Sequence, residues 1–284
     1  MPWFVLSLLL TQGTAPDLQA RIEKLIASSG AEVAVFAASA NGHTRLAIQP
    51  DTSFHAASTM KVPVMIELFR QAEAGLLKMD EQLPVKNEFH SIVDGSVYQM
   101  DVSDDSDTEV YKAIGKTMSL RALCEAMITV SSNFAANLLI ERVGAKNVQA
   151  TVDRLGGTGV RVLRGVEDQK AFDKGLNNVT TAKGLGTLFA HLAAGTAVNK
   201  KADAEMVAIL ERQKFNDAIP AGLPPGTVIA HKTGTITRIH HDAGIVFAPR
   251  PYVLVVLVRG IEDQKVSAAL IASISREAWP DLSK

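Results

Sequence analysis

The sequence contains one cysteine, little net charge and no apolar run long enough to cross a bilayer. With a single cysteine among 284 residues, the chain has no intrachain disulfide framework. Cys124 lies in the apolar helical pattern LCEAMI, which predicts a packed core residue rather than a reactive thiol. A formal net charge of −1 gives no electrostatic case for a nucleic-acid or membrane-surface partner. Apolar residues make up 47% of the chain, which is typical of a globular protein.

A short apolar segment opens the chain. Trp3 to Leu10 form the run, and Gly13, Thr14 and Ala15 after it resemble an export cleavage site. The run is too short to span a bilayer, and the basic residue expected before it is missing. We interpret residues 1–15 as a signal peptide and expect a periplasmic or secreted protein; the alternative is a short apolar tail.

Strand patterns occur near both ends of the remaining chain. Asn41-Gly42 separates the β-rich runs AEVAVFAAS and TRLAIQ, which predicts a hairpin. Three further runs near the end predict strands: GTVIAHKTG, DAGIVFA and YVLVVLVRG. Residues 55–195 are mostly helical in pattern, and a last helical pattern closes the chain.

This order predicts an α/β (α+β) fold with two lobes. Strands joined by hairpin-length connections favour one antiparallel sheet, flanked by the terminal helices, beside an all-helical lobe. We expect residues 16–54 and 196–284 to form the α/β lobe and residues 55–195 the helical lobe, within one domain overall. A ligand cleft is expected between the lobes.

Ser58 and Lys61 could form a nucleophile with its base. Three residues apart on a helix, they share one face. The apolar residues that follow predict burial, which destabilises an ammonium and leaves an amine able to take a proton. The alternative is a serine that caps a helix beside a surface lysine, because a Ser-x-x-Lys match alone is weak.

Two downstream elements could complete a site. The first is a polar turn between two helical patterns, containing Ser131, Ser132 and Asn133. The second ends a strand-like run and contains Lys232, Thr233 and Gly234. A lysine and a hydroxyl suit a substrate carboxylate, and glycine permits a close approach of backbone or ligand. Each also has a plain structural interpretation, as a helix–helix turn and a strand end.

The three elements, in this order and at these separations, resemble those of the serine penicillin-recognising enzymes, and of class A β-lactamases in particular. That family carries Ser-x-x-Lys, Ser-Asp-Asn and Lys-Thr-Gly elements. The flanking segments FHAASTMKVPVM and MITVSSNFAANLLIERVG also resemble family segments, and the resemblance covers nearly the whole chain after the N-terminal tail. It implies a β-lactamase/transpeptidase-like fold.

The resemblance also implies roles for the matching residues. Ser58 would attack the lactam carbonyl, Lys61 would take or relay its proton, and Ser131 would pass a proton to the leaving nitrogen. Asn133 would hold the substrate's side-chain amide and contact Lys61. Lys232 would lower the pKa of Lys61 by like-charge repulsion.

Substrate binding is implied for the strand element. Lys232 and Thr233, beside Gly234, would hold the substrate carboxylate. The backbone N–H groups of Ser58 and Thr235 would form an oxyanion hole. The arginine that usually follows this element is missing at its usual distance; Arg238 is a candidate for the same task.

A deacylation base separates a lactamase from a protein that is only acylated. Glu167 precedes a threonine-rich helix start by about the family's spacing, and Asp168 is the competing carboxylate. The family's water-holding asparagine has no exact counterpart, and the candidates to replace it are Gln169, Asn177 and Asn178. The alternative for this loop is a solvated charged surface.

Three other features depart from the family or suggest other chemistry. Ser132 replaces the family's aspartate, which puts a structural bond in doubt. The acidic stretch 101–110 has the wrong spacing for a calcium loop, and we interpret it as a solvated excursion. His240 and His241 are adjacent, so on a strand they point to opposite faces; with Asp242 they predict hydrogen bonds at a hairpin end rather than a metal site.

The sequence therefore predicts a serine hydrolase that hydrolyses a β-lactam through a Ser58 acyl-enzyme, with Glu167 assisting deacylation. The alternatives are a D-alanyl-D-alanine carboxypeptidase or esterase, and a penicillin-binding sensor that acylates without turnover. We expect no cofactor and no metal, a small-molecule β-lactam or peptidoglycan-like substrate, no nucleic acid, no stable membrane span, and a monomer.

Overall fold

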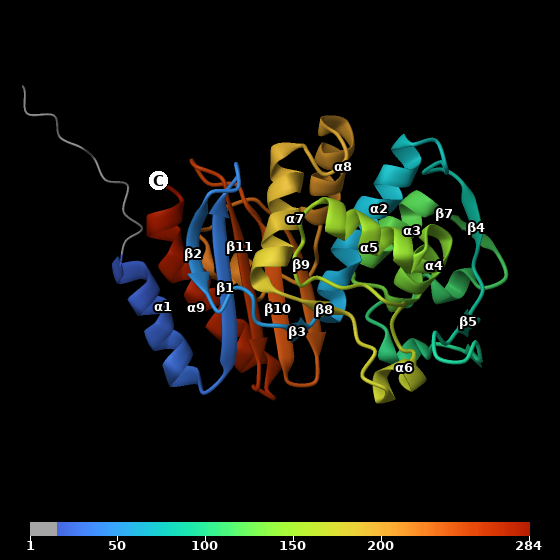
Figure 1. The fold of residues 1–284 in the computed structure, drawn as a ribbon, viewed down its shortest axis with the longest axis horizontal. Coiled ribbons are helices and arrows are strands. Elements are labelled where there is room, and N and C mark those ends of the chain that lie inside the picture. Colours follow the sequence, from blue (N-terminus) through green and yellow to red (C-terminus); the bar gives the residue numbers. More distant parts are fainter. Residues whose placement is uncertain (1–15) are drawn as a thin grey trace, which may run out of the picture.

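The computed structural model describes residues 16–284, and a five-stranded antiparallel sheet is its central feature (Figure 1). The strand order is β2-β1-β11-β10-β9. The strands are β1 (Glu32–Ser39), β2 (Thr44–Ile48), β9 (Ile229–Ile236), β10 (Ile239–Val246) and β11 (Tyr252–Arg259). The predicted Asn-Gly hairpin joins β1 to β2, and the three predicted C-terminal strands are β9, β10 and β11. The α/β fold class predicted from the sequence is confirmed.

Side chains of the sheet alternate between two cores. Val33, Val35 and Val256 pack with the terminal helices α1 (Pro16–Ser29) and α9 (Gln264–Leu282). Their neighbours Ala34, Phe36 and Val255 belong to the other core, against which α7 (Ala182–Ala194) lies. This is the period of two expected of strands that are buried on both faces.

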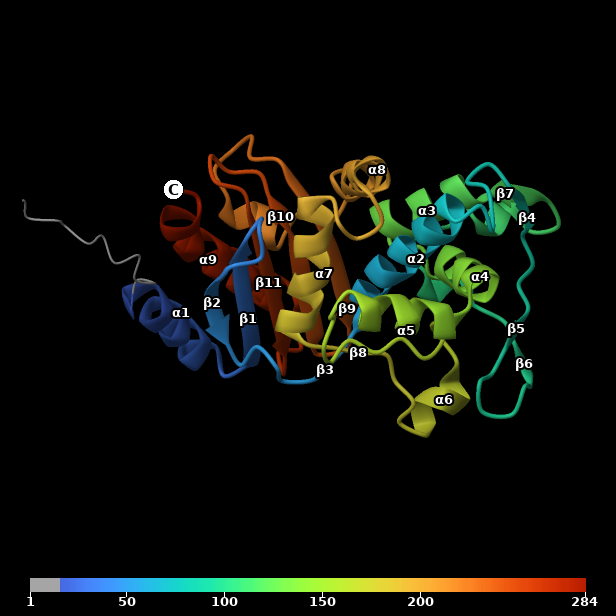
Figure 2. The same ribbon diagram turned by 45° about the horizontal axis from the view of Figure 1, so that its top comes forward.

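The helical part packs around α2 (Lys61–Glu73), which is buried along most of its length (Figure 2). Its neighbours are α3 (Leu120–Thr129), α4 (Asn133–Val143), α5 (Ala145–Arg154) and α8 (Lys200–Leu210). Cys124 of α3 is buried, as expected, and burial raises the pKa of its thiol to about 12.

Short elements surround these helices. Two-stranded pairs are formed by β3 (Phe54–His55) with β8 (Val179–Thr180), by β4 (Gln82–Pro84) with β7 (Thr117–Ser119), and by β5 (Phe89–His90) with β6 (Val97–Tyr98). The remaining elements are α6 (Gln169–Asp173) and the 3₁₀ helices η1 (Ala57–Met60), η2 (Val102–Asp104), η3 (Tyr111–Ala113) and η4 (Ile219–Gly222). The boundary expected at residue 195 stays a prediction; α7, on its N-terminal side, packs on the sheet.

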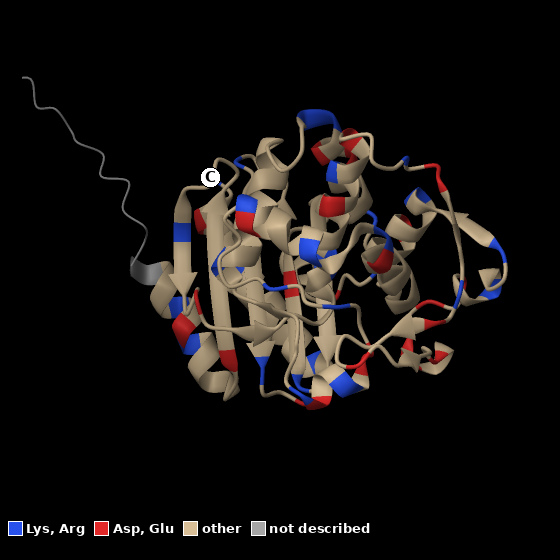
Figure 3. Ribbon diagram, turned by 45° about the vertical axis from the view of Figure 1, so that its right-hand side comes forward, with Lys and Arg blue, Asp and Glu red and all other residues tan. Residues whose placement is uncertain are grey.

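In the described chain, charged residues of one sign do not gather in one region. Lysine and arginine alternate with aspartate and glutamate over both parts of the ribbon (Figure 3). Among the helices of residues 16–284, none has the length and apolarity needed to cross a membrane. The export segment predicted for residues 1–15 lies outside the described residues.

Candidate active site

Ser58 lies on the 3₁₀ helix η1, which runs directly into α2 at Lys61. Ala57, just before it, has a φ of 45°, a conformation that costs about 1–3 kcal/mol for a residue other than glycine. The Ala57 N–H donates to His55 Nδ1 over 3.1 Å and helps to hold this turn. The surrounding structure thus maintains a strained turn that leaves Ser58 half-buried at a cleft.

The strand β9 passes this turn at very short range. A Cβ atom at Gly234 would lie 3.0 Å from the backbone nitrogens of both Ser58 and Thr59. A side chain there would press on the backbone of η1, so glycine suits this close approach, as its position in the sequence suggests. The next residue of the strand, Thr235, lines the same cavities as Ser58. The two backbone N–H groups predicted to form an oxyanion hole are thus brought to one cleft.

Lys61 is fully buried and its ammonium group contacts the α3–α4 turn. Nζ donates to Ser131 O over 2.5 Å and to Asn133 Oδ1 over 2.7 Å, and lies 3.3 Å from Ser131 Oγ. Within the described chain, these hydrogen bonds go to Ser131 and Asn133 rather than to Ser58. The pairing predicted from the Ser-x-x-Lys spacing is therefore indirect in this structure.

Both buried lysines have a lowered pKa. Burial lowers the pKa of Lys61 to about 7, although the charges of Asp105 and Glu167 act in the opposite direction. For Lys232, burial and then the charge of Lys61 hold the pKa well below its usual range, against the charge of Asp242. The largest cause for Lys61 is thus burial, whereas the repulsion expected between the two lysines acts on Lys232.

Ser131 connects the two lysines. Its φ of 61° is in the left-handed region, and its side chain is buried. Lys232 Nζ donates to Ser131 Oγ over 3.0 Å and to Thr233 O over 2.8 Å. Because Ser131 Oγ contacts both Nζ atoms, a proton can pass through this hydroxyl between the cleft and either amine.

Asn133 connects Lys61 to Glu167. While its Oδ1 accepts from Lys61, its Nδ2 donates to Glu167 Oε1 over 2.8 Å. Glu167 has a φ of 64° and its residue as a whole is exposed. Desolvation of the carboxyl raises the pKa of Glu167, and the charges of Asp104 and Asp105 add to this rise. The Asn133 hydrogen bond and the charge of Lys61 act against it.

Two buried asparagines hold the segment that precedes Glu167. Asn137 Oδ1 accepts from Val166 N over 2.6 Å, and its Nδ2 donates to Val166 O over 3.0 Å. Asn178 Oδ1 accepts from Leu163 N over 2.8 Å, and its Nδ2 donates to Arg164 O over 2.9 Å. The two side-chain amides take the place of the backbone groups that would pair with the loop in a helix or sheet. The path of the loop is therefore fixed without regular secondary structure.

Asp168, the competing carboxylate, is buried and engaged in structural bonds. It accepts from Ser91 Oγ over 2.8 Å, from Ile92 N over 2.9 Å and from Ala171 N, the last of which caps α6. Glu167 is therefore the carboxylate of this pair that contacts the Asn133–Lys61 chain.

The three side chains proposed to replace the water-holding asparagine make other contacts. Gln169 donates to Asp173 over 2.6 Å at the exposed side of α6, and Asn177 accepts from Arg164 over 3.3 Å. Asn178 bonds to loop backbone, as described above. Gln169 and Asn178 line the second cavity together with Glu167, but the side chain that hydrogen-bonds to Glu167 is that of Asn133.

Two cavities meet at Ser58. The first has a volume of about 290 Å³ and the second about 390 Å³. Both are lined by Ser58, Asn133 and Thr235. The first continues along Ser131 and Thr233, and the second along the loop of Glu167. A substrate bound across Ser58 would therefore meet the strand element on one side and the carboxylate on the other.

Arg238 does not join the other predicted residues. It lies in the β9–β10 turn with a φ of 59°, and its Nη2 donates to Gly260 O over 2.9 Å. Gly260 N–H donates back to Arg238 O over 2.8 Å, so this arginine closes a surface turn. His240 instead lines the first cavity, with Nδ1 3.0 Å from Ser267 Oγ.

The acidic stretch 101–110 is not simply solvated, contrary to our interpretation. Asp107 is buried and Asp105 is half-buried, while Asp104 lines the first cavity. Asp217, in the loop between α8 and η4, lines the same cavity, and the sequence did not single it out. The run of exposed-looking acidic residues concealed these positions, because pattern alone does not reveal which loops fold over a cleft.

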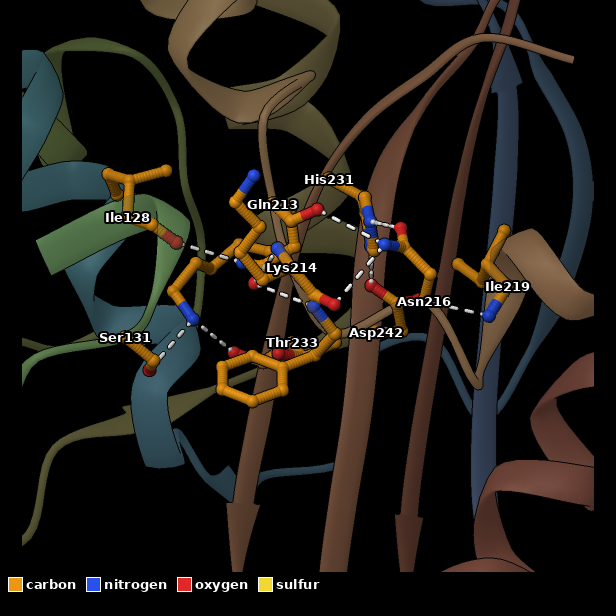
Figure 4. Close-up of polar contacts among 11 residues, drawn as sticks. Ile128, Ser131, Gln213, Lys214, Asn216, Ile219, His231, Thr233 and Asp242 are labelled. Carbon is orange, nitrogen blue, oxygen red and sulfur yellow. Dashed lines mark hydrogen bonds and ion pairs between the residues drawn. The ribbon is translucent and has the colours of Figure 1, made fainter. Parts of the chain in front are cut away.

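A buried polar network lies behind Lys232. His231 Nδ1 is 2.9 Å from Asp242 Oδ1, and its Nε2 is 3.2 Å from Asn216 Oδ1 (Figure 4). Asp242 Oδ2 accepts from Ile219 N over 3.0 Å, which fixes the orientation of the carboxylate. His241 hydrogen-bonds to His55 O over 2.9 Å, and His240 to Ser267 Oγ as described above, so His240, His241 and Asp242 make the hydrogen bonds predicted for them.

The fold and the site elements are those of the serine β-lactamase superfamily. Residues 17–282 match the model of the Beta-lactamase enzyme family, and the chain belongs to this family of hydrolases. The β-lactamase of Streptomyces albus G is 25% identical over 272 residues, which cover 93% of this chain and 84% of that protein. The extended-spectrum β-lactamase PER-1 of Pseudomonas aeruginosa is 24% identical over 283 residues, covering 95% and 88%.

Solved structures show the same fold. The structure of PBP-A is 25% identical, with a TM-score of 0.80 and coverage of 94% of this chain and 96% of that chain. A mutant of PBP-A, equally similar, was solved as an acyl-enzyme complex with penicillin G. A β-lactamase from Xanthomonas campestris has a TM-score of 0.82 at 21% identity, covering 96% and 100%, and this supports the fold alone.

Proposed function

We propose that the protein is a serine β-lactamase of the class A type, which hydrolyses the β-lactam amide through an acyl-enzyme on Ser58. The observation that carries the proposal is the hydrogen-bonded chain Lys61–Asn133–Glu167 beside Ser58. It places an amine with a pKa of about 7 and a carboxylate at one nucleophile, as two-step hydrolysis requires.

Acylation would use the amine side of this chain. Ser58 Oγ attacks the lactam carbonyl carbon and transfers its proton to neutral Lys61, directly or through a water. The backbone N–H groups of Ser58 and Thr235 stabilise the carbonyl oxygen as it gains charge. The carbon–nitrogen bond then breaks, and Ser131 Oγ gives its proton to the leaving nitrogen while Lys61 restores that proton.

Substrate binding would use the first cavity. Thr233 lines this cavity, and Lys232, which is buried and donates to Ser131 Oγ and Thr233 O, would supply positive charge for the substrate carboxylate. Asn133 would receive the side-chain amide. Gly234 supports this arrangement through its close approach to η1. We assign no such role to Arg238, because its guanidinium donates to Gly260 O in the β9–β10 turn.

Deacylation would use the carboxylate side. Glu167 takes a proton from a water, the resulting hydroxide attacks the ester carbon, and the Ser58 oxygen leaves with a proton. The raised pKa of Glu167 suits a base that works near neutral pH. The product is the ring-opened acid, and no cofactor or metal takes part in these steps. We propose further that the enzyme is exported, is monomeric and acts on small β-lactams.

A second candidate function is acylation without turnover, as in a penicillin-binding protein. It is favoured by the likeness to PBP-A, of which one mutant was captured as an acyl-enzyme with penicillin G. A D-alanyl-D-alanine carboxypeptidase would use the same Ser58 chemistry on a peptide.

The test is to mix the purified protein with a chromogenic cephalosporin and to follow colour and intact mass together. Sustained turnover with unmodified protein at the end supports a β-lactamase. One equivalent of colour with a stable adduct on Ser58 would favour the penicillin-binding alternative. No adduct and no turnover would contradict both.

A further inference from the structure

Asp105 reaches the N-terminus of α4 from a separate loop. Its Oδ1 accepts from Asn133 N over 2.9 Å and its Oδ2 accepts from Phe134 N over 2.8 Å. The loop is tied down beside it, because Ser106 Oγ donates to Val130 O over 2.7 Å. One carboxylate thus holds the residue that carries the Lys61 and Glu167 contacts.

The first four N–H groups of α4 can be accounted for completely. Asp105 accepts the first two, and Ser132 Oγ accepts the third from Ala135 over 3.2 Å. The fourth, the N–H of the N-cap residue Ser132, donates to Ala126 O over 3.1 Å. A helix leaves these donors without internal partners, and a negative charge there also interacts favourably with the helix dipole. Without Asp105, the N–H of Asn133 would lose its acceptor.

Asp105 also acts on both proton carriers by its charge. Its carboxylate raises the pKa of Lys61, against the stronger effect of burial, and adds to the raised pKa of Glu167. Lys61 and Glu167 also act on each other, Asp104 adds to the raised pKa of Glu167, and the charge of Lys61 lowers the pKa of Lys232.

We propose that Asp105 is a positioning residue for the reaction: it fixes Asn133 between Lys61 and Glu167, and it supplies from a distant loop the carboxylate that Ser132 lacks. The inference rests on the proposed function, since it assigns the way in which that site is held. Ser132 Oγ lies 3.5 Å from Asp105 Oδ2, so the two side chains converge on the same helix end.

Three variants separate position from charge. Asp105→Asn keeps one acceptor oxygen and removes the charge, whereas Asp105→Glu keeps the charge and displaces it. Asp107→Asn is the matched control, because Asp107 is a carboxylate of the same loop. It accepts from the N–H groups of Glu109 and Val110, away from α4.

The experiment measures kcat against pH for each variant with a chromogenic cephalosporin, together with the melting temperature. We expect Asp105→Asn to lower the plateau of kcat by roughly tenfold or more, since hydrogen bonds to a charged group are lost. We also expect its acidic limb to move to lower pH, because loss of the charge lowers the pKa of both Lys61 and Glu167. Asp105→Glu should lower the plateau of kcat while leaving the acidic limb at the same pH. Asp107→Asn should change the plateau by no more than about twofold and should leave the limb at the same pH.

A limb that stays in place in Asp105→Asn, or an equal loss of kcat in Asp107→Asn, would overturn the inference and indicate a structural loop anchor. Lys61 should also be titrated by carbon-13 NMR of its ε-carbon, without substrate. A lower Lys61 pKa in Asp105→Asn than in the unmutated protein supports the inference even if the unmutated protein shows no β-lactam turnover. An absence of β-lactam turnover in the unmutated protein would contradict the proposed function alone. An unchanged Lys61 pKa in Asp105→Asn would contradict the inference alone.

Discussion

The side-chain amide of Asn133 donates to Glu167 Oε1 over 2.8 Å while accepting from Lys61 over 2.7 Å. One amide therefore links the base proposed for acylation to the base proposed for deacylation. Neither proton carrier contacts Ser58 through a hydrogen bond within the described chain, so the amide sets their positions relative to the nucleophile.

Replacing Asn133 should impair both half-reactions. Asn133→Ala removes an acceptor from a buried lysine and a donor from Glu167, and we expect kcat/KM for a cephalosporin to fall by about 10²-fold. Asn147→Ala is a suitable control, because Asn147 donates to Val143 O at the far end of α4. Equal activity of the two variants in steady-state kinetics would refute the linking role.

Acylation should depend on pH through Lys61. Burial lowers the pKa of Lys61 to about 7, so the amine is neutral above that pH and protonated below it. The acylation rate, measured by stopped-flow quenching and mass spectrometry, should therefore rise between about pH 5 and about pH 8 and then level off. In Lys61→Ala the rate should fall by roughly 10²–10⁴-fold and lose this limb. A pH-independent rate in the unmutated protein would argue against Lys61 as base or relay.

A methyl group at position 234 should disturb the oxyanion site. In Gly234→Ala, the new Cβ would lie 3.0 Å from the backbone nitrogens of Ser58 and Thr59, so β9 and η1 would have to separate slightly. We expect kcat/KM to fall by about 10²-fold, with KM for the substrate changed much less. A variant that retains full kcat would show that the N–H pair does not depend on this approach.

Of the two neighbouring carboxylates, Glu167 and Asp168, we expect Asp168 to contribute to stability, because it is the one engaged in buried structural bonds. Asp168→Asn leaves donors from Ser91 and Ile92 facing an amide, and should lower the free energy of unfolding by about 1–3 kcal/mol. Asp173→Asn, an exposed change on the same short helix, should stay within about 0.5 kcal/mol. Urea denaturation of the two variants measures the difference. An unchanged midpoint for Asp168→Asn would show that the Asp168 carboxylate is not needed for stability, and would leave Asp168 as a candidate base.

Much of the fold was predictable because strands and helices repeat their apolar pattern locally. The hairpin at Asn41-Gly42, the three C-terminal strands and the last helix follow from period and turn residues alone. The approach of Gly234 to Ser58 and the bond from Asp105 to Asn133 join residues far apart in the chain. No local pattern encodes such contacts, which depend on how the loops pack.

The same reason limits the prediction of the site. Ser58, Lys61, Ser131, Asn133 and Lys232 were found because they occur in short motifs. His240 and Asp105 carry no motif. Arg238 is a candidate only because it is the arginine that follows the strand element, and the sequence does not show where its side chain points. The structure turns Arg238 to Gly260 and His240 to the cavity.

The most direct test of the central claim compares the unmutated protein with Glu167→Gln, which keeps the size of the side chain and removes its basicity. Both are mixed with a cephalosporin, and colour and intact mass are followed over the same interval. We predict sustained turnover in the unmutated protein and, in Glu167→Gln, one equivalent of colour with an adduct that persists on Ser58. Turnover by Glu167→Gln at the unmutated rate would contradict the assignment of Glu167 as the deacylation base.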